Sequence, residues 1–362
     1  MARRQDKSGV RIATLRDVAR HAGVSHTTVS RVINGDKVVT GETRQLVEDA
    51  IAALKFSPNP VARALSGAEH IRVGLLHRFP NPGSLGEFLV HLLHHTTKAH
   101  ASLIVRGVAS PDEHEAAVQE LVENRVRAVI LPPPLADEQD LTDRLAAAGI
   151  AIVATGSHRQ SGRIMSVGVD ERVAARAMTQ HLIAIGHRRI GFIAGDDHYA
   201  SADLRLAGFR DALAEAGLRA DPALVAKGLY TYQSGLHAAE RLIGLADQPT
   251  AIFASNDDMA AATIAVAHRR GLDVPSDLSV CGYDDSSLAT TIWPTLTTIR
   301  HPTFEVTRNA LHMILSQVTG GKMPEQGTPY LSHTLVRRQS DAPPRGQSRH
   351  AAVGISAAGF SR

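Results

Sequence analysis

Residues 24–34 read VSHTTVSRVIN, a stretch whose apolar and polar residues fall on opposite faces of one helix. Val29, Val32 and Ile33 recur at helical spacing, which indicates a face that packs against a small core. The positions on the other face form two pairs spaced i, i+4. These positions are His26, Thr27, Ser30 and Arg31. Such a face is either a solvated helix surface or a set of hydrogen-bonding groups for a partner.

Two further short helices flank this stretch. Thr14 and Asp17 have the spacing of a capping box at the start of the first helix, and Gly23 is expected to end it in a tight turn. Ser25 is the expected N-cap of the second helix and Thr40 that of the third. A helix that follows a glycine-containing turn and offers donors near its N-terminus is typical of a helix-turn-helix.

The segment FSPNPVARALSG, residues 56–67, follows the third helix. Asn59 is a candidate N-cap with Pro60 at the first helical position, and Gly67 ends the run. A helix of about two turns is marginal in water, so this one should form only with a partner.

Basic residues concentrate near the N-terminus. Residues 1–67 hold 11 Lys/Arg and 6 Asp/Glu, a net charge of +5, whereas the whole chain has a net charge of +3. The remainder therefore carries −2. A basic head on a mildly acidic body favours a polyanion as partner of the head, although a merely solvated surface could carry the same charge.

The rest of the composition is that of an ordinary globular protein. No run of about 18 uncharged apolar residues is present, so no membrane span is expected. The basic N-terminus MARRQDKSG lacks the apolar core of a secretory signal. Cys281 is the single cysteine, which excludes a disulfide framework and a cysteine-rich zinc site. The cytoplasm is the expected compartment.

From residue 71 onward, apolar strands alternate with alanine-rich helices. Near-continuous apolar runs are typical of strands buried on both faces of a parallel sheet. Expected strands cover residues 71–76, 102–107, 127–132, 150–155, 189–195, 250–255 and 278–283. Expected helices include residues 112–124, 172–186, 203–217 and 257–271. The alternation predicts an α/β body of doubly wound parallel sheets, and its length favours two lobes.

The head resembles the DNA-binding domain of the lactose-repressor family, in order and spacing, over the stretch TLRDVARHAGVSHTTVSRVINGDKVVTGETRQLVEDAIAALKFSPNPVARALSG. The body contains similar segments in the family's order, namely GHRRIGFIAGD, SADLRLAGF, IFASNDDMA, VPSDLSVCGYDD and PTLTTIRHP. The resemblance covers roughly residues 14–340. It implies a sequence-specific transcriptional regulator, expected to be a repressor, with a two-lobed body like a periplasmic binding protein. The cleft between the lobes is expected to bind a small-molecule effector, a carbohydrate, that controls operator affinity.

The resemblance also implies the domain boundaries. The expected order is a flexible basic arm (1–13), a helix-turn-helix domain (14–58), a hinge helix (59–69), a ligand-binding and dimerisation domain (70–340) and a disordered tail (341–362). Within the body, lobe 1 is expected at about 70–169 and 299–330, and lobe 2 at about 170–298 and 331–340.

The family's DNA-contacting positions carry over to seven residues of this chain. They are His26, Thr27, Thr28, Ser30, Arg31, Ala62 and Leu65. An arginine such as Arg31 can bind guanine with two hydrogen bonds in the major groove. Leu65 matches a leucine that the family wedges into the minor groove at the operator centre, where the cost of unstacking is offset by protein contacts that bent DNA permits. The implied partners are a pseudo-palindromic operator in double-stranded DNA and a second copy of the chain, in a homodimer.

The family's effector-binding positions carry over to six residues of the body. They are Ser201, Arg205, Tyr230, Asn256, Asp284 and His301. Polar groups of this kind can share the hydroxyl groups of a sugar in a concave site. A structural ion pair between Arg205 and Asp284 is the alternative interpretation. Asp170 and Asp257 are interpreted as helix N-caps, and Trp293 as either a core residue or a ligand contact.

The chain departs from the family in lobe 1, in the segment 77–95 and at Thr155-Gly156, so the effector's identity stays open. His91 and His95 have a spacing that can chelate zinc, but no third ligand is evident and no metal or cofactor is expected. An enzyme on a doubly wound fold is the alternative function, and the chain has none of the glycine-rich or nucleophile motifs such an enzyme would use. The same scaffold could also act as an activator, and dimer and tetramer both stay open.

Overall fold

The computed structural model describes residues 13–33, 39–54, 71–80, 82–156, 164–318 and 330–345. The chain divides into two compact units, Met1–His70 and Ile71–Arg362, which we call the head and the body. The expected hinge at 59–69, with Ala62 and Leu65, lies outside the described residues. Residues 1–12 of the expected arm and residues 346–362 lie outside them too.

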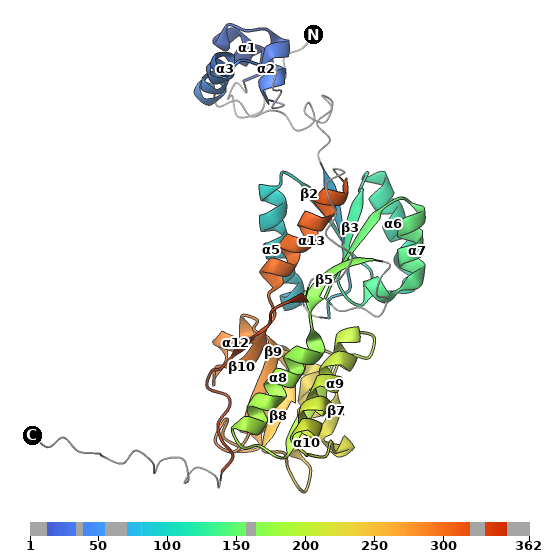
Figure 1. The fold of residues 1–362 in the computed structure, drawn as a ribbon, viewed down its shortest axis with the longest axis vertical. Helices are drawn as coiled ribbons and strands as arrows, with labels where there is room; N and C mark the ends of the chain where they lie inside the picture. The colour runs from blue at the N-terminus through green and yellow to red at the C-terminus, as the bar shows by residue number, and fades with distance from the viewer. Residues whose placement is uncertain are drawn as a thin grey trace, which may run out of the picture. The chain divides into compact units, whose positions relative to one another are not determined.

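The described head consists of the helices α1 (Leu15–Ala22), α2 (His26–Ile33) and α3 (Gly41–Ala53) (Figure 1). The predicted caps are confirmed. Thr14 and Asp17 form a capping box, and Gly23 adopts the left-handed conformation with φ of 68°. Ser25 Oγ accepts from the backbone N–H of Thr28 at 3.0 Å, and Thr40 caps α3. The shared core consists of Val18, Ala19, Val29, Val32, Val47 and Ala50.

Lobe 1 of the body is a parallel sheet covered by helices on both faces. Its strands, in spatial order, are β11 (Tyr330–Leu331), β5 (Met165–Val169), β4 (Ala151–Thr155), β3 (Ala128–Leu131), β1 (Arg72–His77) and β2 (Ser102–Gly107). The helices α5 (Pro82–Lys98) and α13 (Thr303–Val318) pack together on one side, and α6 (His114–Glu123) and α7 (Gln139–Ala147) pack together on the other.

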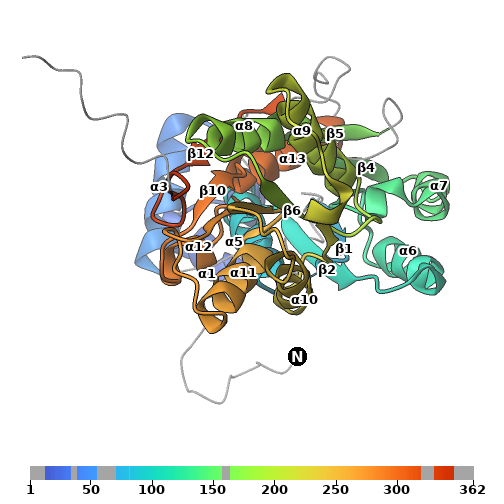
Figure 2. The same ribbon diagram turned by 90° about the horizontal axis from the view of Figure 1, so that it is seen from below.

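Lobe 2 repeats this plan, with one antiparallel strand at the edge. Its strands, in spatial order, are β12 (Thr334–Val336), β10 (Thr297–Arg300), β9 (Ser279–Asp284), β8 (Ala251–Ala254), β6 (Ile190–Ala194) and β7 (Val225–Lys227). The helices α8 (Glu171–Ala184) and α9 (Ala200–Glu215) cover one face, and α10 (Tyr232–Ile243) and α11 (Asp257–Arg269) cover the other (Figure 2). The predicted doubly wound α/β class is confirmed.

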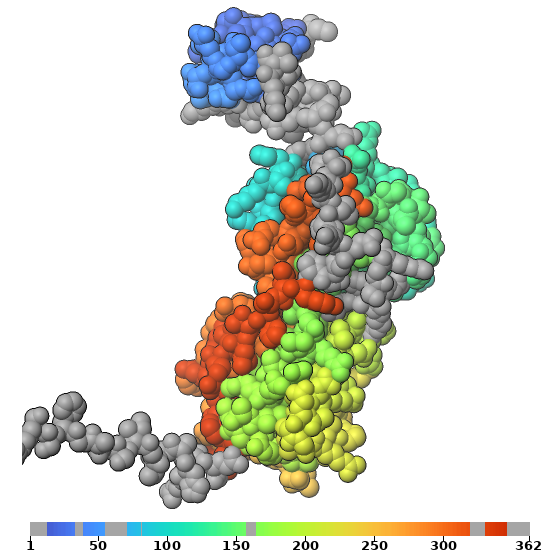
Figure 3. Space-filling view, in the orientation of Figure 1, coloured from blue at the N-terminus to red at the C-terminus, as the bar shows by residue number. Residues whose placement is uncertain are grey.

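The chain passes between the lobes after β5, after β10 and between β11 and β12. The strand β12 pairs with β10 of lobe 2, and residues 337–345, which follow β12, pack against lobe 2 as well (Figure 3). Ser340 and Asp341 are buried, and Asp341 accepts a hydrogen bond from His181 at 2.7 Å. The prediction of a tail beginning at residue 341 is therefore wrong for residues 341–345, which complete lobe 2.

The helices α8 and α9 pack unusually closely. A Cβ atom at Gly208 would lie 2.1 Å from the carbonyl oxygen of Arg172, so only glycine fits this crossing. Next to it, Arg205 Nε donates to Glu171 at 2.8 Å, and the two side chains are only 7% and 3% exposed. The Arg205 guanidinium lies 3.6 Å from the centroid of the Tyr283 ring. This buried ion pair connects the first residue of α8 to α9.

We predict that Gly208→Ala lowers the free energy of unfolding of the body by about 1–3 kcal/mol, because the added methyl group must push backbone against backbone. Thermal or urea unfolding measures the effect. Gly86→Ala is the control, since a Cβ atom there would meet no atom within 4 Å. Equal stability of the two variants would contradict the close packing of α8 on α9.

The buried ion pair gives a second prediction. Glu171→Leu or Arg205→Met should each destabilise the body by about 3–5 kcal/mol, because each leaves a buried charged group without its partner. The double variant Arg205→Met, Glu171→Leu should be more stable than either single variant, because it buries no charge. The exposed pair Arg172–Asp211 joins the same helices, so Asp211→Asn should cost less than about 1 kcal/mol. Additive losses in urea unfolding of the double variant would refute the coupling.

Candidate functional site

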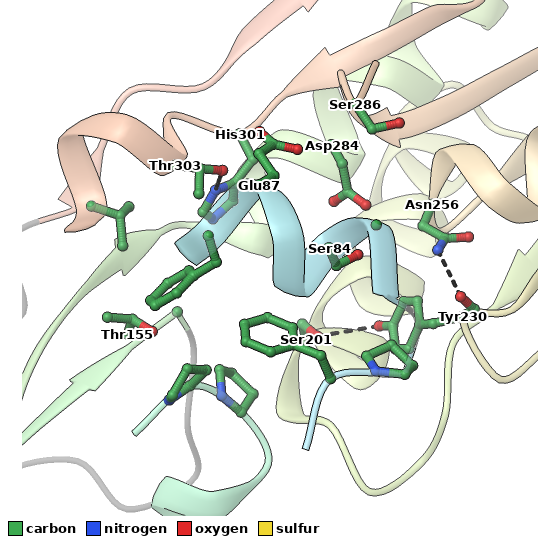
Figure 4. Close-up of a pocket in the computed structure, with 18 of the residues that line it drawn as sticks. Ser84, Glu87, Thr155, Ser201, Tyr230, Asn256, Asp284, Ser286, His301 and Thr303 are labelled. Atoms are coloured by element: carbon green, nitrogen blue, oxygen red, sulfur yellow. Dashed lines mark hydrogen bonds between the residues drawn. The ribbon is translucent and has the colours of Figure 1, made fainter. Parts of the chain in front are cut away.

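A cavity of about 630 Å³ lies between the two lobes of the body (Figure 4). Lobe 1 lines it with the segment after β1, with Pro132 and Pro133 after β3, and with Thr155 and Gly156 at the end of β4. Lobe 2 lines it with residues that follow β7, β8 and β10, with the end of β9 and with α9. Both lobes thus present the carboxyl ends of their parallel strands, where open α/β sheets bind ligands.

All six residues predicted for the effector site line this cavity. They are Ser201, Arg205, Tyr230, Asn256, Asp284 and His301. Ser201 Oγ lies 3.2 Å from the Tyr230 hydroxyl, and the Tyr230 backbone has a strained φ of 59°. Asn256 supports that strained residue, because its side-chain amide donates to the Tyr230 carbonyl at 2.9 Å. The cavity wall at Tyr230 is therefore held in place by the side chain of Asn256.

Asn256 is also the N-cap of α11, since its side-chain oxygen accepts from the backbone N–H of Met259. The prediction that Asp257 caps this helix is therefore wrong by one residue. Asp257 is fully buried and accepts from Ser286 and Thr298 instead. Burial raises the pKa of Asp257 to about 7, against the effect of those hydrogen bonds. The other predicted cap is confirmed, since Asp170 accepts from the backbone N–H of Val173.

Arg205 pairs with Glu171, not with Asp284. Burial opposes the charge on Glu171, but the Arg205 guanidinium outweighs it and holds the pKa of Glu171 below its usual range. Glu171 also lines the cavity, and the sequence interpretation did not identify it. The signal that could have found it is its place as the first residue of α8, two positions after the end of β5 at the first crossover between the lobes.

Asp284 ends β9 with a φ of 112°, and its carboxylate accepts no hydrogen bond from the described part of the chain. Burial and repulsion from neighbouring carboxylates raise the pKa of Asp284 well above its usual range, and Arg205 offsets this only in part. An acceptor that faces a cavity without a protein donor is suited to a ligand that brings its own donors.

Lobe 1 contributes residues that sequence reasoning did not assign. The atypical segment 77–95 supplies Phe79, Ser84, Glu87, Phe88 and His91 to the cavity. Tyr199 of lobe 2 was missed as well, and its hydroxyl donates to the Arg78 carbonyl of lobe 1 at 2.7 Å. This hydrogen bond connects the lobes at the rim of the cavity.

The remaining candidates have less to do with the cavity. His301 lines it, and burial lowers the pKa of His301, which favours the neutral ring. Trp293 is 73% exposed, so neither predicted role, core residue or ligand contact, is seen. His95 Nε2 donates to the Phe304 carbonyl at 3.0 Å. Within the described ranges, no three His, Cys, Asp or Glu residues are placed to hold a metal, and no helix is long and apolar enough to cross a membrane.

In the head, the two faces of α2 separate as the sequence predicts. Val29 and Val32 are buried in the core, whereas His26, Thr27 and Arg31 are exposed. Thr28 and Ser30 are half-buried, and Thr28 Oγ1 lies 2.8 Å from the capping Ser25 hydroxyl. The remaining two predicted DNA contacts, at 62 and 65, are outside the part of the chain that the structure describes.

The chain is similar to known regulators over nearly its whole length. Residues 14–59 match the model of bacterial regulatory proteins of the lacI family, and residues 179–340 match a periplasmic binding protein-like domain. The chain is 32% identical over 346 residues to the HTH-type transcriptional regulator GalR of Escherichia coli (strain K12), covering 94% of this chain and 99% of the relative. It is 30% identical over 333 residues to catabolite control protein A of Priestia megaterium, covering 90% and 98%.

Solved structures give the same result. The lac repressor dimer bound to operator and the anti-inducer ONPF has a TM-score of 0.76 and 29% identity, over 92% of this chain and 100% of that one. The complex of transcriptional regulator CelR with cellobiose has a TM-score of 0.69 and 32% identity, over 91% and 99%. These relatives are transcriptional regulators and not enzymes. The chain belongs to the LacI family of bacterial DNA-binding transcriptional regulators.

Proposed function

We propose that the protein is a repressor whose affinity for operator DNA is controlled by a sugar bound between the lobes of the body. The observation that carries this proposal is the combination of two surfaces in one chain. One is the exposed polar face of α2 in a helix-turn-helix head, and the other is the cavity lined by the six predicted effector residues. The protein would act in the cytoplasm, where its operator is.

The recognition helix in this proposal is α2. His26, Thr27 and Arg31 would read base edges in the major groove, while Thr28 and Ser30 would contact phosphates or base edges. Their exposure on the face opposite Val29 supports this, because a helix that enters the groove must keep its polar face free of its own core.

A homodimer would place two copies of α2 in successive major grooves of a pseudo-palindromic operator. Leu65 and its twin would wedge into the central minor groove, with Ala62 beside them. The lac repressor, a relative of this chain, is a dimer bound to operator, which supports this arrangement. Whether the protein represses or activates depends on where the operator lies relative to a promoter, and repression is the role we propose.

The proposed effector is a carbohydrate. The cavity has the size typical of small-molecule sites and combines apolar rings with a few polar groups, which suits a sugar with hydroxyl edges and an apolar ring face. The relative CelR is bound to cellobiose, which supports the same class. A sugar that touches both lobes would change the angle between them and so the spacing of the two heads in the dimer.

We predict that Arg31→Ala lowers affinity for an operator, selected from a random DNA pool, by roughly 10- to 100-fold, because a bidentate contact to guanine is worth about 1–3 kcal/mol. Arg31→Lys should lose most of the preference for that operator but keep its affinity for scrambled DNA, since lysine keeps the charge and loses the planar fork. Fluorescence anisotropy at fixed salt concentration measures both.

Arg20→Ala on α1 is the matched control, because its side chain is exposed and pairs with Asp17. It should change affinity for the two DNAs by the same factor. If Arg31→Lys discriminated operator from scrambled DNA as well as the natural protein does, base reading by Arg31 would be refuted.

A further inference from the structure

Two carboxylates face the cavity from opposite lobes without a hydrogen-bond donor from the described residues. One is Glu87 on α5 of lobe 1, and the other is Asp284 at the end of β9 in lobe 2 (Figure 4). They lie close enough for the charge on Glu87 to raise the pKa of Asp284. The position of Glu87 is not among the predicted effector contacts, and it belongs to the segment in which the chain departs from its family.

The one guanidinium among the described lining residues is already paired with a carboxylate of the protein. Among the lining residues that the structure describes, Arg205 is the only arginine or lysine, and it pairs with Glu171 and stacks on Tyr283. The pair is neutral as a whole. Arg205 acts to lower the pKa of Asp284 and His91 acts to lower that of Glu87, but the lining holds four carboxyl groups (Glu87, Glu171, Asp258 and Asp284) against one guanidinium.

This arrangement favours ligands that donate hydrogen bonds and carry no negative charge. Burial raises the pKa of Glu87 as well as that of Asp284, because the carboxylate form of each loses part of its solvation in the cavity and is stabilised only when donors replace it. Hydroxyl groups can supply that solvation as donors, and hydrogen bonds to a charged acceptor are the stronger kind. A phosphate or carboxylate group in the same place would add a like charge to a partly desolvated site, which is unfavourable.

The rest of the lining suits the apolar face of a sugar ring. The same cavity is lined with flat apolar surface by the rings of Phe79, Tyr199 and Tyr230 and by the prolines Pro132 and Pro133. The rings of Tyr199 and Tyr230 pack edge to face, with their centroids 5.3 Å apart. An uncharged pyranose has both features that this cavity suits, since its hydroxyl groups donate hydrogen bonds from the ring edge and its C–H groups form an apolar ring face.

We propose that Glu87 is the specificity residue of lobe 1: its carboxylate and that of Asp284 accept hydrogen bonds from hydroxyl groups of one uncharged sugar, and together they exclude phosphorylated and acidic sugars. This inference rests on the proposed function, because it concerns the same effector site. The ligand is then an uncharged sugar, and Glu87 is the residue of lobe 1 that discriminates between neutral and anionic sugars. Contacts to both carboxylates make the ligand bridge the lobes.

Isothermal titration of the full chain tests the inference. The probes are D-glucose, D-galactose, D-xylose and cellobiose, set against glucose 6-phosphate, galactose 6-phosphate, glucuronate and galacturonate. The expected result is binding by at least one neutral sugar, with its anionic counterpart at least roughly 10-fold weaker. Glu87→Ala should weaken the neutral sugar by roughly 10- to 100-fold, which is the range for a hydrogen bond to a charged group.

Glu87→Gln separates charge from shape. It keeps an acceptor of the same size, so it should lower the affinity for the neutral sugar less than Glu87→Ala does. Because it removes the charge, it should also reduce the ratio between the affinities for the neutral and the anionic sugar. Glu123→Gln on α6 is the matched control, because Glu123 is an exposed carboxylate of lobe 1 that bonds Gln119 and does not line the cavity. Far-UV circular dichroism and cooperative thermal unfolding of the sugar-free variants report that they are folded.

An anionic sugar that binds as tightly as its neutral parent would overturn the inference, and so would an unchanged preference in Glu87→Ala. Neither result would contradict the proposed function of a regulator controlled by a sugar. Binding by no sugar of either kind is a different failure, which would refute the carbohydrate effector of the proposed function and this inference with it.

Discussion

A buried guanidinium must have its charge balanced, and the body of this protein is arranged around that requirement at Arg205. Glu171 provides the balance from the first turn of α8, two positions after the strand that leaves lobe 1. The pair thus fixes where the first crossover ends and how α8 meets α9. Because Arg205 donates to Glu171, Asp284 faces the cavity without a hydrogen bond from the arginine, which lowers the pKa of Asp284 only through its charge. One ion pair therefore sets both the packing of lobe 2 and the charge of the ligand site.

Much of this site could be predicted because parallel strands bring their carboxyl ends to one edge. Asn256, Asp284 and His301 each follow or end a strand, so recognising the strand nearly suffices to place the residue. The choice of partners could not be predicted. Arg205 has several acidic candidates in the sequence, and only the packing of α8 on α9 selects Glu171 over Asp284. The place of Glu87 in the cavity could not be predicted, because the segment 77–95 that contains it has no recognisable motif.

Other differences have equally local causes. The strands β7, β11 and β12 have two or three residues each, which is too short for an apolar pattern, so their place in the sheets appears only in three dimensions. The cap of α11 was misplaced by one position because Asn256 and Asp257 are both good N-caps. The hydroxyl groups of Ser286 and Thr298 donate to the Asp257 carboxylate and turn it inward, which leaves Asn256 as the cap. In the head, where short-range caps and spacing determine the helices, prediction and structure agree.

Control of operator binding by a sugar requires that the cavity and the head are coupled, and coupling between two sites is reciprocal. The direct measurement is the affinity of the best-binding sugar for the free protein and for the protein saturated with operator DNA. Two different affinities are expected, and their ratio should equal the factor by which the same sugar changes operator affinity. Identical affinities for the free and the DNA-bound protein would contradict the coupling, since the two sites would then act independently.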